Sequence, residues 1–172
     1  MKKLICVFSI LIFSFAFSQK APDINKIEFT PDAVSQRIMD INGNELPISD
    51  IIAKHKGKVL VIDFWASWCQ DCLKALPKTK ELVANNANVD FVYFSLDRNF
   101  DAWKKGLKKH DLEKKENYFF SAGWKNKFND YVELNWIPRL MVISQNGYIA
   151  KYYATTPEDP EIQKTIDKLT NL

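Results

Sequence analysis

The sequence predicts an α/β layer sandwich. A near-continuous apolar run at residues 59–65 is typical of a strand covered on both faces, and segments with helical spacing alternate with such runs along the chain. In addition, the Asn146-Gly147 pair stands between two apolar runs, which predicts a β-hairpin before the last helix.

The elements are expected in the following order. Residues 20–57 are rich in turn residues and predict a hairpin or loop layer, then a short helix over 50–55 that Ser49 caps and Gly57 ends. After the central strand, a helix is expected from Cys69 to about residue 85, kinked by Pro77. The remaining predictions are a strand over 91–96, helices over 100–110 and 124–134, a short strand over 118–120, hairpin strands over 140–143 and 148–153, and a helix over 158–169.

The first eighteen of the 172 residues have the pattern of a secretory signal. Two lysines precede an apolar run over 4–17, and small residues, Ala16 and Ser18, stand where cleavage is expected. The run is shorter than the ~20 residues that a spanning helix needs. We therefore expect an exported protein with one mature domain over 19–172; an uncleaved membrane anchor is the alternative.

The charge pattern argues against a nucleic-acid partner. The net charge is +3, and loss of Lys2 and Lys3 with the signal would leave +1. No dense basic patch with interleaved aromatic residues occurs. The lysines between residues 104 and 115 are expected to form a solvated helix face, with an acidic partner as the alternative.

The run Trp68-Cys69-Gln70-Asp71-Cys72 lies where the central strand gives way to a helix. Two thiols three positions apart in a first helical turn can reach each other, and a helix N-terminus stabilises a thiolate. The third cysteine, Cys6, belongs to the expected signal, so the mature chain would carry only this pair into an oxidising compartment. The motif predicts dithiol-disulfide exchange that needs no cofactor beyond the Cys69-Cys72 disulfide.

Asp63 interrupts the apolar strand just before the motif. Burial of a carboxylate is costly unless the group is neutral or paired, and desolvation should raise its pKa. Asp63 is therefore a candidate proton acceptor for the Cys72 thiol. The alternative is an aspartate at the end of a strand, satisfied by nearby backbone donors.

Several of these residues together resemble a known family. Residues 61–72 (Val-Ile-Asp-Phe-Trp-Ala-Ser-Trp-Cys-Gln-Asp-Cys), Pro77 and Ile137-Pro138 resemble the thioredoxin fold, and more specifically the exported TlpA-like and ResA-like thiol-disulfide oxidoreductases. The resemblance covers nearly all of the mature chain. It implies a thioredoxin-like three-layer α/β/α sandwich with an N-terminal hairpin and a central helical insertion.

The resemblance also implies roles for individual residues. Cys69 would be the exposed attacking thiol and Cys72 the resolving one. A cis Ile137-Pro138 bond would lie beside the disulfide and present backbone to the substrate chain. Trp68 is expected to be partly exposed beside Cys69, where substrate contact and a core role are equally open.

The family further implies the setting. Clients would be cysteine-containing proteins, electrons would come from a thiol donor at the inner membrane, and the protein would be a periplasmic monomer. The reducing direction follows relatives that keep cysteines reduced for cytochrome c or metal-site assembly.

Two residues depart from the family pattern. Asp71 stands where Pro is usual; like-charge repulsion disfavours the thiolate, whereas a carboxylate in the first turn of a helix is favourable, so the net effect on potential has no fixed sign. Arg139 stands where many relatives carry Thr, which puts an inherited substrate preference in doubt.

Other readings of the cysteine pair remain open. Two cysteines supply half of a metal site, but neither His55 nor His110 lies in a tight ligand motif, so no metal is predicted. A thiol peroxidase of related fold is a second alternative, although the Pro-x-x-x-Thr-x-x-Cys pattern is absent before Cys69. An inert structural disulfide or a scaffold without redox activity would leave the motif unexplained.

Overall fold

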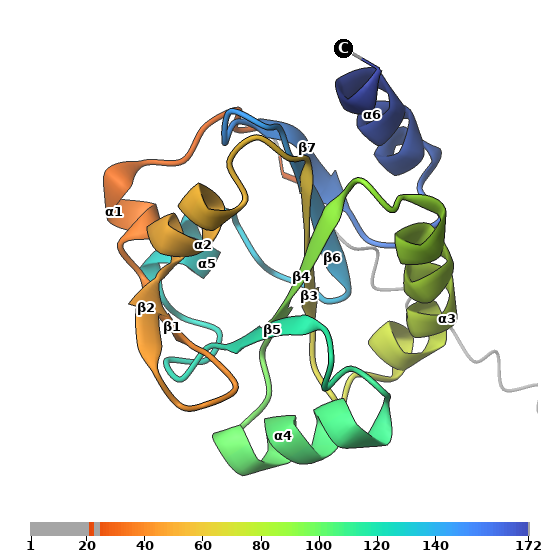
Figure 1. Cartoon of the computed structure of the whole chain (residues 1–172). Helices are drawn as coiled ribbons and strands as arrows, with labels where there is room; N and C mark the ends of the chain where they lie inside the picture. The colour runs from red at the N-terminus through yellow and green to blue at the C-terminus, as the bar shows by residue number, and fades with distance from the viewer. Residues whose placement is uncertain (1–20, 23–24, 172) are drawn as a thin grey trace, which may run out of the picture.

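The computed structural model describes residues 21–22 and 25–171, which form an α/β sandwich of three layers (Figure 1). The expected signal at 1–18 lies outside the described residues. In the described part of the chain, no helix is both long enough and apolar enough to cross a membrane.

The helices and strands have the following bounds. The strands are β1 (Arg37–Met39), β2 (Glu45–Pro47), β3 (Leu60–Trp65), β4 (Asp90–Ser95), β5 (Glu116–Phe119), β6 (Arg139–Ile143) and β7 (Ile149–Ala154). The helices are α1 (Pro31–Val34), α2 (Ile48–Lys54), α3 (Gln70–Asn85), α4 (Phe100–Lys109), α5 (Lys127–Tyr131) and α6 (Pro160–Thr170).

The strands form one mixed sheet in the order β2-β1-β5-β4-β3-β6-β7. β3, β4 and β5 run parallel, whereas β6 and β7 are antiparallel and form the hairpin expected around Asn146-Gly147. β3 lies between β4 and β6, and all its side chains are buried, which explains its continuous apolar run. The N-terminal hairpin β1–β2 extends the sheet beside β5 through the Met39–Phe119 pair.

Alternation along β3 assigns its side chains to two cores. Val61 packs with Leu82 of α3 and Ile162 of α6 on one face. Ile62 and Phe64 belong to a larger cluster on the other face. Figure 1 shows α3 and α6 on one side of the sheet and α1, α2 and α5 on the other, which confirms the predicted layers.

The central insertion consists of α4 and β5, so it adds a parallel strand as well as the expected helix. Two local predictions were wrong. The helix over 124–134 is limited to Lys127–Tyr131, because the side chain of Asn126 accepts from the N–H of Asn129 and starts the helix late. Helix α2 begins at Ile48 after Pro47, so Ser49 lies inside the helix and does not cap it.

Candidate functional site

The cysteine motif lies at the carboxyl end of β3. Cys69 is the N-cap of α3, and it forms a disulfide with Cys72 with 5.3 Å between the two Cα atoms. The backbone N–H of Cys72 donates to Cys69 Sγ at 3.1 Å. After reduction, this N–H and the positive end of the helix dipole would favour a thiolate at Cys69.

Exposure does not separate the two cysteines as the resemblance implied. Cys69 is 7% exposed and Cys72 is 5% exposed. What separates them is their surroundings: Cys69 follows Trp68, which is 46% exposed, whereas Cys72 lines an internal cavity beside Asp63. The exposed surface next to the disulfide therefore lies on the Cys69 side.

The loop before β6 faces the disulfide. The Ile137–Pro138 peptide bond is cis, as expected, and Ile137 O lies 3.7 Å from Cys69 Sγ. Trp136 precedes this bond and is 37% exposed. No role for Trp136 follows from the sequence pattern, although Trp136 directly precedes the Ile-Pro pair. The disulfide thus has an exposed tryptophan next to it in the chain and another in the facing loop.

Asp63 is buried on the inner side of the disulfide. Its Oδ2 accepts from Thr79 Oγ1 at 3.4 Å, and its Oδ1 has no hydrogen-bond partner among the described residues. Burial raises the pKa of Asp63 to about 7, and the Thr79 bond opposes this only in part. The direction of the shift agrees with the expectation, and no backbone donor from residues 21–22 or 25–171 satisfies the carboxylate.

The segment that presents the motif is fixed by residues that sequence analysis missed. Ser67 donates from its backbone N–H to both carboxylate oxygens of Asp97 at 3.2 Å, and its hydroxyl donates to Asp97 Oδ1 at 2.6 Å. Helix α4 approaches so closely that a Cβ on Gly106 would lie 2.3 Å from Ser67 Cβ. The inserted helix therefore packs directly on the loop before Cys69.

Asp71 stays at the surface. Its carboxylate is 55% exposed and lies 3.4 Å from Lys74 Nζ in the next turn of α3. Solvent and Lys74 therefore weaken its action on the thiols.

Arg139 is buried inside the fold. It is 1% exposed, and its Nη2 donates to Tyr152 O at 2.8 Å and to Val132 O at 3.3 Å. Its guanidinium lies 4.3 Å from the ring centroid of Tyr153. Arg139 thus ties β7 and the end of α5 to the loop that carries Pro138. The replacement of the usual Thr by Arg139 therefore affects contacts inside the fold.

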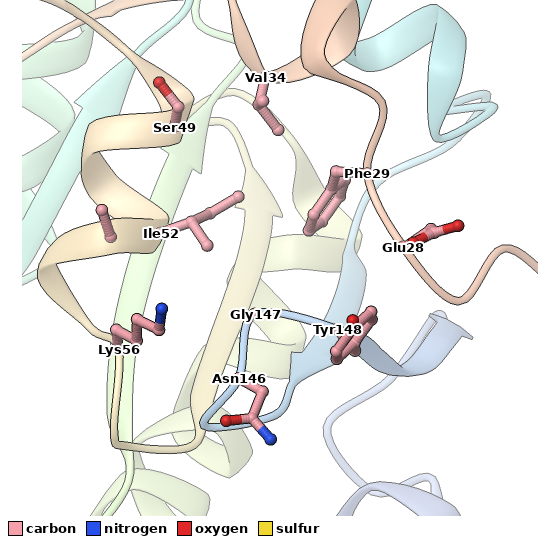
Figure 2. A pocket seen from close by; sticks show the side chains of 10 residues that line it. Glu28, Phe29, Val34, Ser49, Ile52, Lys56, Asn146, Gly147 and Tyr148 are labelled. Carbon is pink, nitrogen blue, oxygen red and sulfur yellow. The ribbon is translucent and has the colours of Figure 1, made fainter.

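A second hollow lies near the opposite end of the central strands, where β3 begins and β6 ends (Figure 2). It has a volume of about 330 Å³ and lies between α2, the segment before α1 and the Asn146-Gly147 turn. Figure 2 shows Phe29, Val34 and Ile52 lining this hollow, and no cysteine contributes to it. Among the described residues, no group of three or more His, Cys, Asp or Glu side chains is placed to hold a metal ion.

Comparisons with known proteins agree with this geometry. A family model described as thioredoxin-like matches residues 57–149. The solution structure of a candidate thiol-disulfide oxidoreductase from Bacteroides vulgatus is 32% identical and has a TM-score of 0.67, covering 83% of this chain and 91% of that one. A thiol-disulfide oxidoreductase from Bacteroides fragilis, 22% identical with a TM-score of 0.61 over 74% of this chain and 94% of that one, shares the fold.

Curated relatives match over a shorter length. Thiol-disulfide oxidoreductase ResA from Bacillus cereus is 27% identical over 93 residues, which cover 53% of this chain and 51% of the relative. The chain spans about half the length of the curated relatives it matches.

Proposed function

Because the chain belongs to the thioredoxin-like family, we propose that it is a thiol-disulfide oxidoreductase that exchanges its Cys69-Cys72 pair with cysteines of client proteins. The observation that carries the proposal is the disulfide at the N-terminus of α3, with the cis Ile137–Pro138 bond beside Cys69 and Asp63 in the cavity that Cys72 lines. An inert disulfide across so few residues would constrain the unfolded chain little.

The proposed reaction has two exchanges. The Cys69 thiolate attacks a client disulfide; a Cys69–client bond forms, the client bond breaks, and one client thiolate leaves and takes up a proton. Asp63 then accepts the proton of Cys72, whose thiolate attacks Cys69 Sγ and releases the second client thiol. The client gains two electrons, and the protein is left with its own disulfide.

The surface around Cys69 supports roles for three neighbours. Trp68 is exposed, and Ile137 O lies next to Cys69 Sγ, so Trp68 and the Ile137-Pro138 backbone would contact the client chain. The similarity to ResA and the signal-like start support a periplasmic location, where the protein would reduce client cysteines and would itself be reduced again by a membrane thiol donor. Clients in cytochrome c or metal-site assembly fit that role.

The reduction potential of the Cys69-Cys72 pair tests the direction. Equilibration with thiol buffers, followed by tryptophan fluorescence, should give a value near that of thioredoxin, about −270 mV. A value near about −120 mV would make the protein an oxidant and overturn the reductase assignment.

Cysteine variants test the activity itself. Cys69→Ser should abolish turnover of a protein disulfide, whereas Cys72→Ser should accumulate mixed disulfides that a reductant releases. Turnover at the unaltered rate in either variant would contradict the proposal.

A further inference from the structure

A small cavity lies directly beneath the disulfide. The lining residues that carry polar atoms are Asp63, Trp65, Cys72, Thr79 and Tyr93, and the cis Pro138 closes one side. Its volume is about 10 Å³, measured as the space open to the centre of a water molecule. A space of this size holds about one water.

Two buried oxygens at this cavity have no hydrogen-bond partner among the described residues. They are Asp63 Oδ1 and Tyr93 Oη, and the indole N–H of Trp65, another lining residue, also has no partner among the described residues. Asp63 on β3 is the register partner of Tyr93 on β4, so the two side chains leave the sheet on the same face. A buried polar atom left without a partner costs about 1–3 kcal/mol, and such atoms in native proteins are commonly satisfied by ordered water.

We propose that a resident water in this cavity accepts a hydrogen bond from Tyr93 Oη and donates one to Asp63 Oδ1, which makes Tyr93 a positioning residue for the buried acid. The cavity supplies the space, and the two oxygens supply a donor and an acceptor. The expected effect on the rate at which Cys72 resolves a mixed disulfide rests on the proposed function, because it concerns the proton that Cys72 gives up. The presence of the water does not depend on the proposed function.

The sign of the effect follows from the direction of the bonds. A chain of donors from Tyr93 through the water to the carboxylate favours the ionised form of Asp63 and lowers its pKa. The titratable groups that line the cavity are Asp63 itself, Tyr93 from β4 and Cys72 from α3; Thr79 and Pro138 carry no charge. Burial, and then the charge of Asp63, raise the pKa of Tyr93, so the phenol keeps its proton and stays a donor.

The test is the Tyr93→Phe variant, which keeps the ring and removes only the hydroxyl. Carbon-13 NMR of the Asp63 carboxyl should show its pKa rising by about one unit, a tenfold change in proton affinity. Nuclear Overhauser contacts between water and the cavity should be present in the wild type and lost in the variant. The pH at which Cys72 resolves a mixed disulfide should move upward with the Asp63 pKa.

Tyr118→Phe is the matched control. Tyr118 is a buried tyrosine of the neighbouring strand β5, and its hydroxyl donates to Glu116 at 2.6 Å; it does not line the cavity. This control should leave the Asp63 pKa unchanged. An unchanged Asp63 pKa in Tyr93→Phe, or a wild-type cavity without water contacts, would overturn the inference. The NMR readouts need no turnover, so a protein that fails to exchange disulfides would refute the proposed function and leave this test intact.

Discussion

The two ends of the parallel strands differ in how their buried ionisable side chains are paired. Where β4 and β5 begin, the His55 ring lies between two carboxylates, with Nδ1 2.7 Å from Asp90 and Nε2 3.2 Å from Glu116. Near the other end of β3, Asp63 has only the weak bond from Thr79. The first end pairs its charges fully, and the second leaves an acid without a cation.

The pKa values follow from this difference. Bonds to Glu116 and Asp90 raise the pKa of His55 despite its burial. Burial alone would raise the pKa of Glu116, but bonds from His55, Lys54 and Tyr118 lower it to about 2. Asp63 lacks such partners, and its pKa rises to about 7. Pairing therefore favours stability, whereas the unpaired acid is set to exchange a proton near neutral pH.

Asp63→Asn should have the largest effect on stability. The folded protein keeps the Asp63 proton up to about pH 7, whereas the unfolded chain loses it near 3.8, so stability falls as pH rises through this window. The variant removes that loss and should gain up to about 4 kcal/mol in free energy of unfolding at pH 8. Urea unfolding at pH 4 and pH 8 checks this. An equal gain at both values would show that ionisation is not the cause.

His55→Gln should weaken the opposite end of the sheet by about 2–3 kcal/mol at pH 6, because it removes two hydrogen bonds to charged groups. The pKa of His55 is raised, so its contribution is complete below about pH 6.5 and is lost as pH rises through the folded pKa. Thermal unfolding from pH 5 to pH 9 measures this.

His110→Gln is the control for that experiment. Burial, and then the charges of Lys109 and Lys80, lower the pKa of His110, so its pH dependence has the opposite sign. The two histidine variants should therefore differ most at low pH; parallel pH curves would refute the role of the His55 pair.

Gly106→Ala should disturb the disulfide end by packing. The added Cβ would meet Ser67 Cβ at 2.3 Å, so α4 or the loop before Cys69 must shift, at a cost of about 1–3 kcal/mol that is partly offset by better helix propensity. Because this loop presents Cys69, the reduction potential of the Cys69-Cys72 pair should change as well.

Gly43→Ala serves as the comparison, since Gly43 has a φ of +87° with open space around it. Its backbone strain should lower stability without altering the potential. An equal change of potential in both variants would contradict the role given to the Gly106–Ser67 contact.

Local patterns predicted most of the fold and the centre of the site. The run at 59–65, the Asn146-Gly147 turn and the cysteine spacing each depend on neighbours in sequence. The structure confirms the strand and the hairpin, and it joins Cys69 and Cys72 in a disulfide. The Ser67–Asp97 contact, the Gly106 approach and the course of Arg139 depend on residues that the fold brings together from distant positions. No periodicity encodes such contacts. Tyr93 was missed for a related reason, because its significance comes from being the register partner of Asp63 on the neighbouring strand. The exposure of Trp136 likewise depends on how the folded loop presents it.

Lys54→Ala should have the smallest effect on the free energy of unfolding. It tests whether the exposed lysines contribute to neutralising Glu116 and Asp90. Lys54 Nζ lies 2.8 Å from Glu116 Oε1, but the lysine side chain is 59% exposed, and exposed ion pairs contribute about 0–1 kcal/mol. Its matched partner is Lys58→Ala, whose Nζ lies 3.2 Å from Asp90 with a similar exposure of 61%. Both variants should lose little stability, and less at high salt. If either loss reached that of His55→Gln, the outer lysines and not the buried imidazole would neutralise the two carboxylates.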